Sequence, residues 1–369
     1  MSEKTILITG GSGFIGSNLI RLIRQKKSYR VVNLDKLTYA ASPATLADLQ
    51  DDDGYVFVQG DIGNRELMRW IFKEYQPIGV LNLAAESHVD RSIEAPDDFV
   101  QTNVVGTQHL LHESLTYWQK LSAEEKSNFR FLHVSTDEVF GELGVDGFFT
   151  EETRYAPNSP YSASKAASDH FVRAYQHTYG LPVMLTNCSN NYGPYQFPEK
   201  LIPMMIFNAL RGQLLPVYGD GSNVRDWIHV NDHCRAILSV FESGQTGETY
   251  VIGANAEEKN IDLVKRICSI MDELLPVADN PSLGDKEIAS YAELIHFVTD
   301  RPGHDQRYAI DASKINSQLG WQPQMSLDEG LRQTVRWYVE NLEWVNQASG
   351  GKFSDWLDKN YAWRMEAKV

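Results

Sequence analysis

The sequence predicts an α/β protein, in which a Rossmann-type doubly wound parallel sheet is joined to a smaller C-terminal α/β substrate domain. Three observations predict this class. Short apolar runs alternate with polar or amphipathic stretches, an order typical of a parallel sheet covered by helices. A glycine-rich turn joins the first apolar run to a helical pattern. After about residue 190 the alternation weakens and Pro and Gly become frequent, which indicates a second domain.

The expected strands are six apolar runs with little polar alternation, which is typical of strands that are buried on both faces. They are TILIT at 5–9, RVVNL at 30–34, YVFVQ at 55–59, GVLNLAA at 79–85, FRFLHVS at 129–135 and PVMLTNCS at 182–189. Helices are expected at 201–212 and 261–275. The run GETYVIGA at 247–254 looks like one more strand that returns to the sheet.

The composition is that of a globular protein that binds neither nucleic acid nor a membrane. The chain has 369 residues, 42% of them hydrophobic, and is long enough to bury a substantial core. A net charge of -15 would repel nucleic acid and anionic membranes, so an anionic substrate has to meet locally clustered Arg and Lys. The sequence shows no signal-peptide pattern and no apolar run of about eighteen residues, so we expect a cytoplasmic protein.

The cysteines and histidines do not form a metal-ligand pattern. Cys188, Cys234 and Cys268 show no CxxC or Cys/His spacing, which favours buried thiols over disulfides or structural zinc. His229 and His233 have the i, i+4 spacing of a zinc-binding pair, but the glutamate of an HExxH motif and a third ligand are missing. We therefore expect no metal.

The glycine-rich turn predicts a dinucleotide site. In TGGSGFIG, Gly10, Gly13 and Gly16 lie between strand and helix, where they let the backbone approach a pyrophosphate at the helix N-terminus. Asp35 ends the second strand, where its carboxylate can accept a hydrogen bond from a ribose 2′-OH and would repel a 2′-phosphate. Together these features favour NAD over NADP. They also favour a dinucleotide site over a purely structural turn beside a solvated Asp.

A tyrosine and a lysine supply a candidate redox base. Tyr161 and Lys165 are four residues apart in a helical pattern that begins after NSP at 158–160, so both side chains share one helix face. A nearby ammonium and a positively charged nicotinamide ring would favour the phenolate, which could take the proton of a substrate hydroxyl. Without the dinucleotide motif, the pair would indicate a surface Tyr and a solvated Lys. His88 is an alternative base, although a structural role is the favoured interpretation.

Two adjacent carboxylates follow the fifth expected strand. In STDEVFGE, Asp137 and Glu138 could be solvated loop charges, which is the usual reason for such a pair. They could also be the acid and the base of one site, because mutual repulsion and unequal burial can keep one carboxyl protonated and the other ionised. The two residues alone leave both interpretations open.

The order of the motifs resembles that of a known family. The chain contains TGGSGFIG, AAESHVDRS, STDEVFG, YSASK, SNNYGPYQFPEKLIP, GDGSNVRDWIHVNDH and RPGHDQRYAID. This order resembles the extended short-chain dehydrogenase/reductase superfamily. The Thr-Asp-Glu triplet and the EKLIP and RPGH runs resemble its dTDP-glucose 4,6-dehydratase branch. The resemblance extends from about residue 4 to residue 337 and does not cover the tail.

The resemblance implies a hydro-lyase that converts dTDP-glucose to dTDP-4-keto-6-deoxyglucose and recycles a tightly bound NAD. Tyr161 with Lys165 would serve the oxidation at C4, and Thr136 would hydrogen-bond the sugar near C4. Glu138 would remove the C5 proton, Asp137 would protonate the departing C6 hydroxyl, and hydride would return to C6. Alternatives are a UDP-sugar 4,6-dehydratase, or a 4-epimerase or decarboxylase, which has no use for the acid pair. A remote alternative is a non-catalytic dinucleotide sensor.

The resemblance also implies two groups of binding residues. The cofactor group adds to Tyr161 and Lys165 the residues Gly10, Gly13, Phe14, Ile15, Gly16, Asp35, Lys36, Thr38, Asp61, Ile62, Leu83, Ala84, Ala85, Ser87, Thr102 and Asn191, with Ser12 at a further cofactor position. The substrate group is Ser87, Thr136, Asn190, Glu199, Lys200, Leu201, Arg225, Asn260, Arg301 and His304. Within it, the two arginines and the histidine would grip the diphosphate. Gln306 and the run YAASPATL depart from the family pattern.

The domain organisation follows from these motifs. We expect residues 1–190, with 228–256 returning to them, to form the NAD-binding domain. Residues 191–227 and 257–345 would form the nucleotide-sugar domain, with a ligand cleft between the two, and 346–369 a tail. The resemblance implies a homodimer in which helices at 97–115 and 163–179 pack across a two-fold axis.

Overall fold

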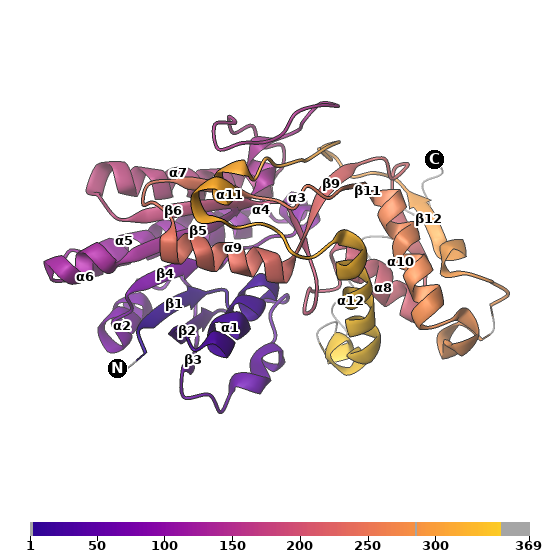
Figure 1. Cartoon of the computed structure of the whole chain (residues 1–369), viewed down its shortest axis with the longest axis horizontal. Coiled ribbons are helices and arrows are strands. Elements are labelled where there is room, and N and C mark those ends of the chain that lie inside the picture. The colour runs from indigo at the N-terminus through magenta and orange to yellow at the C-terminus, as the bar shows by residue number, and fades with distance from the viewer. Residues whose placement is uncertain (1–2, 285, 348–369) are drawn as a thin grey trace.

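A computed structural model describes residues 3–284 and 286–347 (Figure 1). Its larger part is a seven-stranded sheet in the order β10-β6-β5-β4-β1-β2-β3, in which all neighbours are parallel. The predicted α/β class is confirmed, with all six expected strands and the returning strand. These strands are β1 (Thr5–Thr9), β2 (Arg30–Asp35), β3 (Tyr55–Gln59), β4 (Gly79–Asn82), β5 (Arg130–Thr136), β6 (Val183–Cys188) and β10 (Thr249–Ile252).

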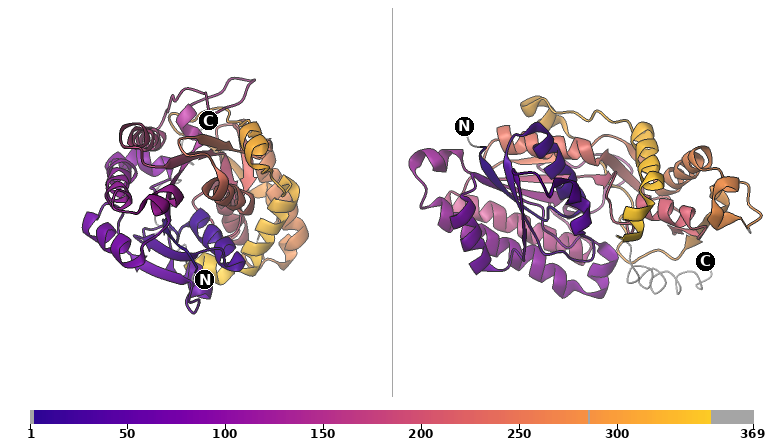
Figure 2. Two further views of the ribbon diagram at one scale, coloured as in Figure 1. Left: turned by 60° about the vertical axis from the view of Figure 1, so that its left-hand side comes forward. Right: turned by 90° about the horizontal axis from the view of Figure 1, so that it is seen from below.

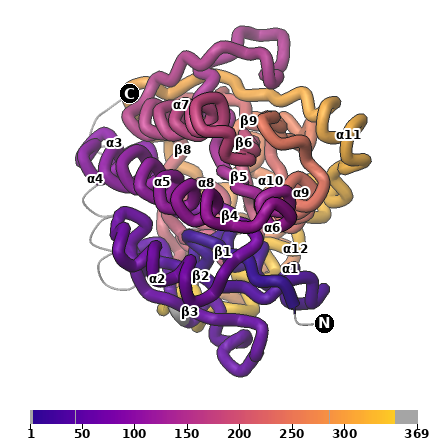
Figure 3. The backbone as a smooth tube through the Cα atoms, turned by 90° about the vertical axis from the view of Figure 1, so that its left-hand side faces the viewer, coloured from indigo at the N-terminus to yellow at the C-terminus, as the bar shows by residue number. Residues whose placement is uncertain are grey.

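Helices cover both faces of this sheet, as Figure 3 shows. Successive residues of a strand point to opposite faces, so Ile6 and Ile8 pack against one helical layer and Leu7 against the other. The first layer contains α1 (Phe14–Lys26), α9 (Val230–Ser243) and α11 (Ser313–Leu319), and the second contains α2 (Arg65–Tyr75), α5 (Thr107–Trp118) and α7 (Pro160–Tyr179). Because both faces are covered, the strands are apolar throughout, which made them recognisable in the sequence.

The smaller part lies beside the sheet, as the orange and yellow segments of Figure 2 show in the right-hand view. It has a hydrophobic core of its own. Its helices are α8 (Leu201–Leu210), α10 (Asn260–Leu274) and α12 (Leu327–Glu340). Two small sheets complete it, with the orders β11-β9-β7 and β12-β8. Their strands are β7 (Asn190–Tyr192), β8 (Leu215–Tyr218), β9 (Val224–His229), β11 (Glu257–Lys259) and β12 (Ile295–Val298).

The chain passes several times between the two parts. It leaves the large sheet after β6, returns to it with α9 and β10, leaves with β11 and α10, and returns once more with α11 before α12. The domain boundaries expected from the sequence stay a prediction. Almost all of the expected tail, residues 348–369, lies outside the described residues.

The helix expected at 97–115 is present, but it is not a regular α-helix throughout. The structure has α4 (Pro96–Phe99), a π-helical turn η2 (Val100–Gly106) and then α5. The side chain of Asn103 is buried beside this wide turn, where it bonds both backbone groups of Glu86, at 2.9 and 3.0 Å, and donates to Oγ of Ser164 at 2.9 Å. The turn therefore fastens the loop after β4 to α7, and such wide turns are frequent at functional sites.

The remaining helices are short. They are α3 (Val89–Glu94), α6 (Ala123–Asn128), and the 3-10 helices η1 (Pro43–Leu49), η3 (Asp137–Phe140), η4 (Val277–Asp279), η5 (Pro281–Leu283) and η6 (Tyr291–Leu294). Within residues 3–284 and 286–347 no helix has both the length and the apolar character needed to cross a membrane. The three cysteines are buried and free, as expected.

Candidate active site

One pocket of about 420 Å³ lies between the large sheet and the smaller part. Its walls come from the loops after β1, β2, β4, β5 and β6, and from β8, β9 and the segment around Arg301. The direction of strand order changes between β1 and β4, where ligands of open α/β sheets bind. Every residue assigned above to catalysis, NAD or the nucleotide sugar lines this pocket, except Ser12. The roles of these residues stay predictions.

The glycine-rich turn packs too closely against other backbone for side chains. Gly10 has a φ of +71°, and a Cβ atom there would lie 2.7 Å from the backbone nitrogen of Ala84. A Cβ at Gly16 would lie 2.4 Å from the carbonyl oxygen of Gly10. Glycine at position 10 therefore lets the turn pass close to the loop after β4, and glycine at position 16 lets α1 start close to the turn, an arrangement that fits a bound pyrophosphate.

Asp35 is held in place at the end of β2. Its two carboxylate oxygens accept hydrogen bonds from the backbone N–H groups of Ser12, at 2.9 Å, and Leu37, at 2.8 Å. Burial raises the pKa of Asp35, and these two bonds oppose the rise. Ser12 thus orients Asp35 and does not line the pocket. The glycine turn and the fixed carboxylate fit the dinucleotide predicted from the sequence.

The Thr-Asp-Glu triplet forms a tight turn at the end of β5. Thr136 is the N-cap of η3, because its Oγ1 accepts a hydrogen bond from the N–H of Glu138 at 3.3 Å. The same hydroxyl donates to Oδ1 of Asp137 at 3.3 Å. The turn directs both carboxyls toward the pocket instead of solvent, so the interpretation as loop charge is wrong for their position.

The two carboxyls have different electrostatic surroundings. Burial, Glu138 and Asp226 raise the pKa of Asp137 well above its usual value, and its Oδ2 has no hydrogen-bond partner among the described residues. Burial also raises the pKa of Glu138, but Arg301, Lys200 and Arg225 pull it back. The arrangement therefore favours a protonated Asp137 beside an ionised Glu138, the state that an acid and a base require.

Tyr161 and Lys165 share the buried face of α7, which begins with a capping box at Ser159. The Tyr161 ring packs edge-on against Phe99, with ring centroids 6.3 Å apart. Burial and Glu138 raise its pKa well above the usual value, and a hydrogen bond with Thr136 opposes the rise. The expected stabilisation of the phenolate by Lys165 stays a prediction. The Lys165 ammonium donates to the carbonyl of Val134 at 2.9 Å.

The smaller part contributes cations and unsatisfied polar atoms. Arg225 is buried, donates to the carbonyl of Asp305 at 2.7 Å and stacks over the ring of Tyr308. Buried polar atoms without a hydrogen bond among the described residues include Nε of Arg301 and the side-chain oxygens of Asn190 and Asn260. Since buried polar atoms in proteins are usually paired, these atoms indicate a polar ligand.

Glu199 and Lys200 connect the two parts on either side of the pocket. The Lys200 ammonium donates to the carbonyl of Ser87 at 2.7 Å. Glu199 accepts from Tyr39 at 3.1 Å and from Arg91 at 3.2 Å, and burial raises its pKa to about 7. Both residues belong to the predicted substrate group, and the structure shows that they also hold the pocket walls together.

Sequence reasoning missed several further pocket residues, among them Asp90 and Tyr218. The hydroxyl of Tyr218 donates to Asp90 at 2.8 Å, and the guanidinium of Arg301 lies 3.4 Å from the same carboxylate. Asp90 thereby ties α3 to β8 and to Arg301. The run VDRS contained an acid of no special pattern, so this cross-chain role had no local signal.

The histidines considered from the sequence have structural contacts. His88 lines the pocket but caps α3, where its Nδ1 accepts from the N–H of Arg91 at 3.4 Å, and burial lowers its pKa well below the usual value. His229 caps α9, and His233 contacts the amide oxygen of Asn191 at 2.8 Å. Within the described ranges, no cluster of three or more His, Cys, Asp or Glu side chains could hold a metal ion.

Comparison with known proteins agrees with this site. The family model for GDP-mannose 4,6 dehydratase matches residues 7–334. The chain is 52% identical over 368 residues to dTDP-glucose 4,6-dehydratase 1 of Escherichia coli K12, with 97% of this chain and 99% of that protein covered. It is 56% identical over 349 residues to the dTDP-glucose 4,6-dehydratase of Xanthomonas campestris pv. campestris strain B100, with 95% and 97% covered.

A solved structure is also similar. The dTDP-glucose 4,6-dehydratase of Streptomyces venezuelae, with NAD and TYD bound, superposes with a TM-score of 0.82 at 43% identity, and 93% of this chain and 99% of that chain are covered. The resemblance stated from the motifs is confirmed at both levels, the superfamily and its branch. The chain therefore belongs to the dTDP-glucose 4,6-dehydratase family.

Proposed function

We propose that the chain is an NAD-dependent dTDP-glucose 4,6-dehydratase, which converts dTDP-glucose to dTDP-4-keto-6-deoxyglucose and water. The observation that carries this proposal is the placement of Asp137 and Glu138 in the same pocket as Tyr161, with unlike surroundings for the two carboxyls. Family membership supports the substrate class, and the NAD and TYD in the Streptomyces relative support the cofactor and the dTDP moiety.

The residues at the carboxyl edge of the sheet would hold NAD. When bound, NAD takes a hydride from C4 of the sugar and returns it to C6. The turn at Gly10 and Gly16 would receive the pyrophosphate, Asp35 would accept from the adenosine ribose, and Lys165 would lie on the nicotinamide side. Since the cofactor ends each turnover in its starting form, the protein has no need to release it.

Tyr161 would act as the base for oxidation at C4. Its phenolate oxygen would accept the proton of the C4 hydroxyl, while Thr136 would orient the C4 oxygen. The pKa of Tyr161 is raised by burial and by Glu138, so it needs positive charge nearby before it can serve as a base. Lys165 and the cofactor ring are the two sources of that charge.

Glu138 and Asp137 would then carry out the elimination. The C5 proton is acidic beside the C4 ketone and would pass to Glu138, while Asp137 would protonate the C6 hydroxyl as it leaves as water. After reduction at C6, Glu138 would return a proton to C5. The balance closes when the proton gained by Tyr161 replaces the one lost by Asp137, so the net change is the loss of one water.

The nucleotide would lie toward the smaller part. Arg225 and Arg301 carry the positive charge that a diphosphate requires on a chain of net charge -15, and His304 lies beside them in the pocket wall. Asn190 and Asn260 would use their unsatisfied side-chain oxygens for the sugar or the nucleotide. This division places the reacting sugar carbons next to η3 and α7.

Incubation with dTDP-glucose and UDP-glucose, followed by mass spectrometry and NMR of the products, tests the proposal. Deuterium placed at C4 should be recovered at C6, and solvent deuterium should enter at C5. A 4-epimerase would give neither result and no loss of water. Preferred turnover of UDP-glucose would favour the UDP-sugar dehydratase, and the absence of any product would favour the non-catalytic sensor.

We also propose a cytoplasmic homodimer. Large apolar side chains are exposed on neighbouring elements of one face, namely Ile93 on α3, Val100 on η2 and Phe171 on α7, with exposures of 41%, 50% and 40%. Such a group is typical of an interface between copies. Sedimentation equilibrium should give twice the mass of the chain, and Phe171→Glu should shift it to the monomer.

A further inference from the structure

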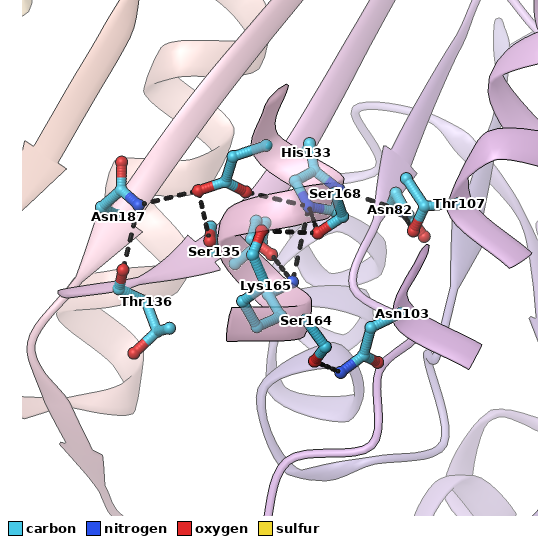
Figure 4. A network of polar contacts seen from close by, with 12 residues as sticks. Asn82, Asn103, Thr107, His133, Ser135, Thr136, Ser164, Lys165, Ser168 and Asn187 are labelled. Atoms are coloured by element: carbon cyan, nitrogen blue, oxygen red, sulfur yellow. Dashed lines mark hydrogen bonds and ion pairs between the residues drawn. The ribbon is translucent and has the colours of Figure 1, made fainter. Parts of the chain in front are cut away.

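A buried polar network lies behind the face of α7 that carries Tyr161 and Lys165 (Figure 4). Its centre is Asp169, which lies one helical turn after Lys165, is fully buried and does not line the pocket. The proposed mechanism has no use for this carboxylate. A buried ionised group costs free energy of folding unless it is paired, so the presence of a carboxylate at Asp169 needs an explanation.

The contacts of Asp169 differ between its two carboxylate oxygens. Oδ2 accepts from the hydroxyls of Tyr155 at 2.8 Å and Ser135 at 2.9 Å, and from the amide of Asn187 at 3.3 Å, whereas Oδ1 has no hydrogen bond among the described residues. Three donors around Oδ2 leave no role for a carboxylic proton there. Burial would raise the pKa of Asp169, but hydrogen bonding and the charge of Lys165 lower it below the usual value.

His133 lies between the carboxylate and the ammonium, and its neighbours fix its tautomer. The hydroxyl of Thr9 receives the N–H of Ala84 and therefore donates to Oδ1 of Asn82, at 2.6 Å. This bond turns the amide NH₂ of Asn82 toward Nδ1 of His133, at 3.0 Å, so Nδ1 is the acceptor. The proton of the neutral ring is on Nε2, which lies 3.3 Å from Oγ of Ser168 and 3.4 Å from Oδ1 of Asp169.

Lys165 is the cation that this arrangement surrounds. Its ammonium lies 3.4 Å from Nε2 of His133 and is fixed by the carbonyl of Val134 at 2.9 Å. The groups that face it are Asp169 on its own helix, His133 on β5 and Cys188 on β6. Tyr161 lies one helical turn before it on α7. Burial lowers the pKa of Lys165, and Asp169 is the first of the groups that oppose the decrease.

We propose that Asp169, held by His133, is a positioning residue that serves as the counter-ion of Lys165 and keeps it charged beside Tyr161. The proposal rests on the proposed function, because it concerns the charge that Tyr161 needs for oxidation at C4. Without Asp169, the desolvated ammonium would lose a proton more readily. Tyr161 would then lose the neighbouring positive charge that favours its phenolate.

The same carboxylate connects the two halves of the catalytic apparatus. Asn187, which donates to Asp169, also donates to the carbonyl of Thr136 at 3.0 Å. Ser135, the residue before Thr136, donates to Asp169 directly. Asp169 thus joins the end of β5, which carries the acid and the base, to α7, which carries the tyrosine and the lysine.

The test is Asp169→Asn, which keeps the shape and several hydrogen bonds but removes the charge. The rate of C4 oxidation is measured over a range of pH in a single turnover, from the absorbance of reduced nicotinamide. Loss of a nearby opposite charge moves a pKa by about one to three units. We expect the alkaline limb of the pH profile to move to lower pH by about one unit or more, because the ammonium loses its proton at lower pH without the carboxylate. A uniform decrease at every pH, with the alkaline limb in place, would overturn the proposal.

Asp232→Asn is the matched control. Asp232 is also a buried carboxylate and accepts from two backbone N–H groups, of Gln324 and Met325, both at 2.9 Å, but it lies outside the pocket. This variant should lose stability and keep both limbs of the wild-type profile. Should Asp169→Asn not fold, His133→Phe removes the ring that lies between the carboxylate and the ammonium and keeps the carboxylate, and the alkaline limb should move in the same direction by a smaller amount. An unmoved alkaline limb in that variant would reject the proposal.

A second measurement does not depend on turnover. NAD affinity of the cofactor-free protein is measured by calorimetry from neutral to alkaline pH, because a charged Lys165 would contribute to binding. Affinity of Asp169→Asn should fall several-fold more steeply than that of the wild type as the pH rises. Equal slopes would contradict the proposal. If the wild type itself forms no product from dTDP-glucose, the proposed function fails instead, and only this second result then bears on Asp169.

Discussion

Replacement of Asp137 by Asn isolates the proposed acid, because Asn keeps the size and polarity of the carboxyl but has no acidic proton. An ordinary Asp, with a pKa near 3.9, would be protonated in about one molecule in a thousand at pH 7. Burial, Glu138 and Asp226 raise the pKa of Asp137 and so increase the fraction of molecules in which it is protonated. We expect Asp137→Asn to slow elimination by about 10²–10⁴, which corresponds to about 3–5 kcal/mol in activation free energy.

The assay separates elimination from oxidation. NAD-loaded protein is mixed with a limiting amount of dTDP-glucose, and the absorbance of reduced nicotinamide is followed. In the wild type the signal should rise and decay within one turnover, whereas in Asp137→Asn it should rise at a similar rate and persist. Glu142→Gln is the control, because Glu142 follows η3 closely but lies outside the pocket. If elimination in Asp137→Asn stays within a few-fold of the control, Asp137 is not the acid.

Three further predictions use other parts of the structure. Tyr161→Phe should abolish the absorbance rise in the same single-turnover assay. A near-normal rise would show that another residue is the base. Gly16→Ala should release NAD during gel filtration, because its Cβ would lie 2.4 Å from the carbonyl oxygen of Gly10; retention of a full equivalent would contradict this. Burial raises the pKa of Glu113 but hydrogen bonds from two arginines lower it overall, so its stabilisation is present above the usual pKa of Glu and lost as the pH falls. Glu113→Gln should therefore lower the free energy of unfolding by about 1–2 kcal/mol at pH 7, discounted for the exposed arginines, and the difference from wild type in urea melts should shrink toward pH 3.

The sequence predicted the features whose signal is local. The strands of the large sheet are apolar on both faces, and the turn at Gly10 lies directly between a strand and a helix, so a few neighbouring residues were sufficient. The π-helical turn was not predicted, and the side chain of Asn103 within it bonds Glu86 and Ser164, which lie far away in the sequence. A helical pattern in the sequence contains no information about such distant partners.

The charge states of the site residues were less predictable than which residues line the site. That one of Asp137 and Glu138 would be protonated could be expected, but which one depends on Arg225 and Arg301, which come from the smaller part. The spacing of Tyr161 and Lys165 was likewise correct, whereas the neighbours of the ammonium lie on other elements. Charge states depend on the three-dimensional surroundings, and motifs alone do not specify them.

The position of β10 at the edge of the large sheet has a consequence for synthesis of the chain on the ribosome. β10 pairs with β6, yet it is made about sixty residues after it. At roughly 5–20 residues per second, one edge of the apolar strand β6 waits several seconds for its partner while the segment between them is made. An open strand edge can pair with another chain during that interval. The yield of native protein should therefore depend more on the speed of translation through residues 189–252 than on the stability of the finished fold.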